Sequence, residues 1–128
     1  MPARLLTVVL GALLAVSLPA SAHHAFGAEF DADRPILLKG KIVKVEWVNP
    51  HTWLHLTVDD GKGGKVEWAA EGRAPGVLLR AGWTRSSLKA GETVTVDMSP
   101  AKNGTLTAII ARVTKADGTI LSNNPAPQ

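Results

Sequence analysis

Apolar and polar residues alternate along much of residues 36–115, which is the pattern of half-buried β-strands. The first predicted strand covers residues 36–48, and its apolar phase shifts near Val43. We therefore expect a bulge or a strong bend around Gly40, of the kind that helps a sheet close into a barrel. Further strands are predicted at residues 53–59, 65–70, 93–98 and 105–115.

The segments between these strands predict turns and a single short helix. Asn49 and Pro50 mark a turn before the second strand; a helix capped there is the alternative, but the period-two pattern that follows favours a strand. Residues 75–81 are predicted to be helical, because Pro75 stands early in the segment and Gly82 lies just past its end.

This order of elements predicts a mainly β fold, a small five-stranded OB-like Greek-key barrel with one short helix. Three strands, a helix and two further strands match the layout of the oligonucleotide/oligosaccharide-binding fold. Another open antiparallel barrel or a sandwich is the alternative, because strand order alone does not determine topology.

The N-terminal residues have the three parts of a cleavable signal peptide. Arg4 supplies positive charge, residues 5–18 are apolar, and Ala20, Ser21 and Ala22 precede the expected cut. The apolar run of about fourteen residues is shorter than the roughly 20 that a bilayer-spanning helix needs. We therefore expect cleavage after residue 22, a periplasmic or secreted protein, and no membrane span after cleavage.

Cleavage divides the chain into four expected parts: the signal peptide at 1–22, an extended segment at 23–35, the barrel domain at 36–121 and a disordered tail at 122–128. Only Arg4 is lost among the charges, so the 14 basic residues of the full chain fall to 13, against 11 acidic residues. This even balance, without a basic stripe, argues against nucleic acid as a partner.

The sequence contains no cysteine. This excludes a cysteine nucleophile, thiolate metal ligands and haem attachment through C-x-x-C-H. No nucleophile, base and orienting group stand in a recognisable arrangement either, so a binding function is favoured over an enzyme. Glu46, Glu67 and Glu71 would supply a carboxylate ligand or an acid–base pair if adjacent strands bring them together; pairing with surface lysines is the simpler explanation.

Two of the four histidines, His23 and His24, would stand at the mature N-terminus. A terminal histidine offers a free amine and its ring Nδ1 as a chelating pair, and a second histidine completes a three-nitrogen site that suits Cu(II). This terminus resembles that of histidine-brace copper proteins. Copper is therefore the candidate ligand, although a terminus that binds no metal is the simpler explanation.

The second ligand is expected from His51 or His24. His51 follows Pro50 at a strand boundary, where a loop can meet the N-terminal segment. His24 offers another route, because an amine, a backbone amide and a second-position imidazole also chelate Cu(II). His55 lies roughly 13 Å from His51 along a regular strand, so these two cannot share one metal ion.

Two tryptophans flank the predicted turn at Asn49 and indicate a second possible function. Trp47, Asn49, Trp53 and His55 would form a surface for an unknown protein or small-molecule partner, with no metal involved. Packing in the core of a small barrel is the alternative for a tryptophan, and it fits Trp68 directly.

Three short motifs together resemble those of a family of small, exported bacterial proteins of unknown function. They are His-His-Ala-Phe at residues 23–26, the W-x-N-P-H-x-W pattern at residues 47–53 and Gly-Trp-Thr-Arg at residues 82–85. The resemblance spans residues 23–121. It implies family membership, with no activity, substrate or ligand set to carry over.

Overall fold

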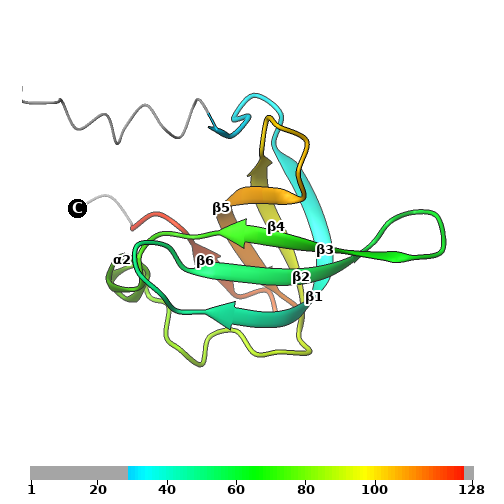
Figure 1. The fold of residues 1–128 in the computed structure, drawn as a ribbon. Helices are drawn as coiled ribbons and strands as arrows, with labels where there is room; N and C mark the ends of the chain where they lie inside the picture. The colour runs from blue at the N-terminus through cyan, green and yellow to red at the C-terminus, as the bar shows by residue number, and fades with distance from the viewer. Residues whose placement is uncertain (1–28, 126–128) are drawn as a thin grey trace, which may run out of the picture.

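The computed structural model describes residues 29–125, which form a six-stranded sheet and one short helix (Figure 1). The strands are β1 (Ile36–Glu46), β2 (Trp53–Asp59), β3 (Lys65–Glu71), β4 (Thr93–Pro100), β5 (Thr107–Lys115) and β6 (Ile120–Ser122), and helix α2 (Pro75–Arg80) lies between β3 and β4. Within residues 29–125, no helix is long and apolar enough to cross a bilayer.

The sheet closes into a barrel of five strands (Figure 1). The strands β3, β2, β1, β4 and β5 pair antiparallel in that order, and the barrel closes where β3 runs parallel to β5. The closing contact is short and joins Ala69 to Thr107, Ala70 to Ala108 and Glu71 to Ile109. Strand β6 adds to the same edge of β5 farther along. A closed five-stranded barrel with one short helix confirms the predicted mainly β, OB-like fold.

Strand β1 bends around the barrel near the position that its sequence predicts. Its register with β2 shifts between Ile42 and Lys44, which places a bulge at Val43. A Cβ atom on Gly40 would lie 2.9 Å from the backbone oxygen of Thr57, so the close approach of these two strands requires glycine. The bent strand pairs with β4 through its first half and with β2 through its second.

The inward-facing apolar residues of the alternating strands fill the barrel. Each large apolar side chain gains roughly 1.5–3 kcal/mol when it leaves water, so this interior is the main source of stability. Trp68 packs against the core while remaining partly exposed. The largest fully buried side chains are Ile42, Leu54, Leu56, Leu78, Trp83, Val94, Val96, Met98 and Val113.

The end of helix α2 directs Trp83 into this core. Gly82 follows the helix with a φ of 95°, a conformation that L side chains rarely adopt. The Gly82 amide donates to the carbonyl oxygen of Leu79 at 3.2 Å. The Trp83 amide donates to that of Leu78 at 3.0 Å. In this Schellman arrangement, the residue after the glycine packs back against the helix.

Thr52 is buried, with a hydroxyl that no residue within 29–125 binds. Burying an unpaired hydroxyl costs roughly 1–3 kcal/mol, and valine has a similar shape. Thr52→Val is therefore expected to keep the free energy of unfolding unchanged or raise it by about 1 kcal/mol, as measured by urea denaturation. A decrease of more than about 1 kcal/mol would show that the hydroxyl forms a stabilising bond.

Candidate functional site

Backbone hydrogen bonds position His51 in the connection between β1 and β2. The Thr52 amide donates to the carbonyl oxygen of Arg73 at 3.1 Å, and the Gly72 amide donates to that of Thr52 at 2.7 Å. These bonds tie the connection to the chain that leaves β3, where Glu71 is the last strand residue. The two segments bring His51 Nδ1 to 3.0 Å from Glu71 Oε1.

The two members of this pair differ in exposure, at 48% for the His51 side chain and 11% for that of Glu71. Burial raises the pKa of Glu71; the neighbouring His51 opposes this rise, and the negative charge of Glu29 adds to it. A positive ion bound at His51 would therefore favour the ionised form of Glu71, whose carboxyl group has little access to water.

The chain before β1 is held against the turn between β4 and β5. Glu29 accepts a hydrogen bond at its backbone oxygen from the Lys102 amide, at 2.9 Å, and the Asp31 amide donates to Pro100 at 2.8 Å. Phe30, between them, is 4% exposed and bridges to the end of β4. These contacts hold residues 29–31 against the end of β4 and the turn that follows it.

The charge of Glu29 acts on the His51–Glu71 pair, because it raises the pKa of Glu71. His23 and His24, the predicted terminal ligands, lie outside the described residues. His23 stands six positions before Glu29. A segment of that length reaches about 20 Å when fully extended.

His55 lies on β2 between two other carboxylates. Its Nε2 is 2.9 Å from Glu46 Oε2, and its Nδ1 is 3.3 Å from Glu67 Oε1. The hydrogen bond with His55, followed by that with Lys44, lowers the pKa of Glu46. Because both ring nitrogens of His55 face carboxylates, neither is turned toward an open ligand position.

His51 differs in this respect, because its Nε2 forms no ion pair or hydrogen bond with the residues that the structure describes. Within residues 29–125, no three histidine or acidic side chains are arranged to hold a metal ion. His51 is therefore a single available nitrogen ligand, and a copper site there would take its other nitrogens from His23 or His24.

Trp47 is partly buried and packs against other residues of the protein. It meets Trp83 edge to face, with centroids 6.4 Å apart and an interplanar angle of 78°. The guanidinium carbon of Arg85 lies 5.6 Å from the Trp47 centroid, within cation–π range. The fold thus brings residues 47–53 and 82–85, two of the motif segments, into contact.

The other residues of the predicted partner surface lie in the connection between β1 and β2 and on β2. Asn49 is exposed and is joined to Pro50 by a cis peptide bond. Trp53 is half-buried on β2, paired in register with Glu46 on one side and Glu71 on the other. None of the four predicted surface residues lines the pocket that His51 borders.

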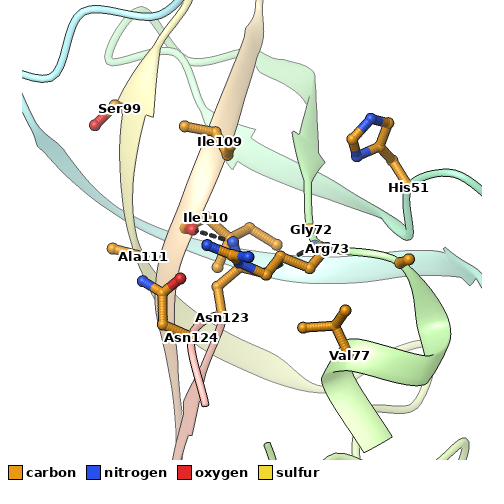
Figure 2. Close-up of a pocket in the computed structure, with 11 residues that line it drawn as sticks. His51, Gly72, Arg73, Val77, Ser99, Ile109, Ile110, Ala111, Asn123 and Asn124 are labelled. Atoms are coloured by element: carbon orange, nitrogen blue, oxygen red, sulfur yellow. Dashed lines mark hydrogen bonds between the residues drawn. The ribbon is translucent and has the colours of Figure 1, made fainter. Parts of the chain in front are cut away.

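That pocket, of about 510 Å³, opens beyond the short contact between β3 and β5. Its apolar wall is formed by Val77 of helix α2 with Ile109 and Ala111 of β5. His51 stands at its edge, and Figure 2 shows the side chain of Arg73 extending across it toward β5. No sequence pattern singles out Arg73, because a single arginine after a strand has no distinctive spacing.

Asn123 fills the gap between β3 and β6 on the edge of β5. Its Nδ2 donates to Ile110 O at 2.8 Å and its backbone amide to Ala111 O at 2.9 Å, while its Oδ1 accepts the Arg73 amide at 2.8 Å. It is 3% exposed. The predicted disordered tail at residues 122–128 includes Asn123, whose role no sequence pattern indicates, since one asparagine among polar residues follows no periodic pattern.

Comparison with known proteins identifies the family. No curated protein matches the chain. A family model matches residues 11–110, a range that extends from before β1 into β5. The chain therefore belongs to DUF6152, a family of unknown function.

Proposed function

We propose that this protein is exported and binds Cu(II) through His23 and His51, for storage, delivery or sensing of the metal. The observation that carries the proposal is the contact between His51 Nδ1 and Glu71, at 3.0 Å. Histidine ligands of metal ions almost always place their second ring nitrogen against a carboxylate or carbonyl, which fixes the ring. The contact leaves His51 Nε2 as the nitrogen for the metal.

The position of Glu29 supports this assignment. The negative charge of Glu29 raises the pKa of Glu71, and the six positions from Glu29 back to His23 would span about 20 Å when fully extended. After cleavage before His23, its amine and Nδ1 would provide two nitrogen ligands and His51 a third, a set that suits Cu(II). The positive metal ion would also offset the cost of burying the Glu71 carboxylate.

The proposal is tested by Cu(II) titration and electron paramagnetic resonance of exported protein whose N-terminus is verified as His23. We expect one tightly bound, nitrogen-ligated ion per chain and an affinity at least about 100-fold lower in His51→Ala. His55→Ala is the matched control, because its ring nitrogens already face Glu46 and Glu67. This control should bind copper as tightly as the unchanged protein.

Two further variants of the protein distinguish between the possible sets of copper ligands. Several extra residues before His23, none of them histidine, move the terminal amine away from both histidines and should abolish tight binding. Glu71→Gln removes the charge beside His51 and should weaken binding roughly 10–100-fold. Unchanged affinity in His51→Ala would contradict the proposal and indicate terminal chelation through His24 alone.

A further inference from the structure

We propose that the pocket beside His51 binds a small monocarboxylate with a short apolar body. This ligand would require no copper and would lie against residues other than the terminal histidines. The volume of about 510 Å³ falls within the roughly 300–1,000 Å³ typical of small-molecule sites. The chemistry of the two sides of the pocket indicates the class of ligand.

One side is apolar because of the alternation along β5. Ala108 and Ile110 have their side chains in the barrel core. Ile109 and Ala111 therefore point outward, where they line the pocket together with Val77 of α2 (Figure 2). An apolar body that covers these side chains removes them from water.

The other side carries a positive charge that is free to bind an anion. Arg73 is exposed and forms no ion pair with an acidic residue within 29–125. Its backbone amide is held by Asn123 Oδ1 at 2.8 Å, which anchors the residue while its side chain extends across the pocket (Figure 2). A guanidinium group donates two parallel hydrogen bonds to a carboxylate. Arg73 is thus the charged contact for the ligand.

Two further side chains provide polar contacts at the same site. Ser99 and Asn124 line the pocket, and neither side chain forms a hydrogen bond with the part of the chain that the structure describes. Their hydroxyl and amide groups can donate to a carboxylate oxygen. With one guanidinium and an apolar wall, the pocket suits a monocarboxylate better than inorganic phosphate, which would leave Val77 and Ile109 uncovered.

The test uses hexanoate, titrated into metal-stripped, exported protein and followed by amide chemical shifts in NMR. The expected shift changes centre on Gly72, Ala111 and Asn124, with a dissociation constant on the order of 1 mM for a ligand this small. Arg73→Gln should weaken binding at least about tenfold. Arg80→Gln is the matched control, because Arg80 is exposed on α2 and does not line the pocket.

Three other ligands and one variant complete the test. Hexylamine, 1-hexanol and inorganic phosphate should each bind more weakly than hexanoate, and Ala111→Trp should block hexanoate by filling the pocket. Equal binding of hexylamine or hexanol would overturn the role of the charge, and equal binding of phosphate would overturn that of the apolar wall. Equal affinity in Arg73→Gln and Arg80→Gln, or shift changes away from the pocket, would also overturn the proposal.

Discussion

Replacing Trp83 with alanine is expected to lower the free energy of unfolding by about 3–5 kcal/mol, the range for truncating a buried aromatic residue. Trp83 is 2% exposed, meets Trp47 edge to face, and donates from Nε1 to the carbonyl oxygen of Ser122 at 2.7 Å. The variant loses all of these contacts and leaves a cavity beside Leu78. Urea denaturation followed by circular dichroism measures the difference.

Two variants keep this prediction testable even if the alanine variant does not fold. Trp83→Phe preserves most of the ring and removes the hydrogen bond to Ser122, so it should cost about 1–3 kcal/mol. Trp53→Ala, on the half-buried outer face of β2, should cost less than Trp83→Ala. If the two alanine variants were equally destabilised, Trp83 would not be a principal core residue.

Replacing Asn123 with leucine is expected to lower the free energy of unfolding by about 2–4 kcal/mol. Leucine has a similar volume but cannot bind the Arg73 amide or the Ile110 carbonyl oxygen, both of which Asn123 holds at 2.8 Å. Leaving a buried backbone group without a partner costs roughly 1–3 kcal/mol. Urea denaturation gives the total effect, and hydrogen exchange should show the Arg73 amide exchanging faster.

Asn124→Leu is the matched control for that prediction. Asn124 is the next residue along the chain and is exposed, so its replacement should change stability by no more than about 0.5 kcal/mol. Similar stability in Asn123→Leu and Asn124→Leu, with unchanged exchange at Arg73, would contradict the bridging role of Asn123.

The strands and the helix were predictable because their signals are local. Alternation identifies each strand, and Pro75 and Gly82 delimit the helix, which ends at Arg80 in the structure. The bulge at Val43 follows from a change of phase within one strand. The parallel contact of Ala69 with Thr107 has no comparable local signal, because it depends on how the whole sheet curves.

The sequence indicates which residues are candidates for the site, but not which of their side chains contact one another. The position of His51 after Pro50 indicated a loop histidine, whereas its contact with Glu71 depends on the register of β2 with β3 and on two backbone bonds beyond it. The strands bring Glu46 and Glu67 together, as one interpretation of the sequence allows. The two carboxylates lie against the two ring nitrogens of His55. The contacts of Arg73 and Asn123 join segments that are far apart in the chain, so no residue spacing in the sequence predicts them.

The parallel contact between β3 and β5 also determines when the barrel can form during synthesis. Strands β1, β2 and β3 are made first and can pair as hairpins, but the free edge of β3 has no partner until Thr107 and the residues after it have been made. Asn123 follows later still. Contacts between segments so distant in the chain form slowly, and the barrel cannot close before residues 107–109 have been made.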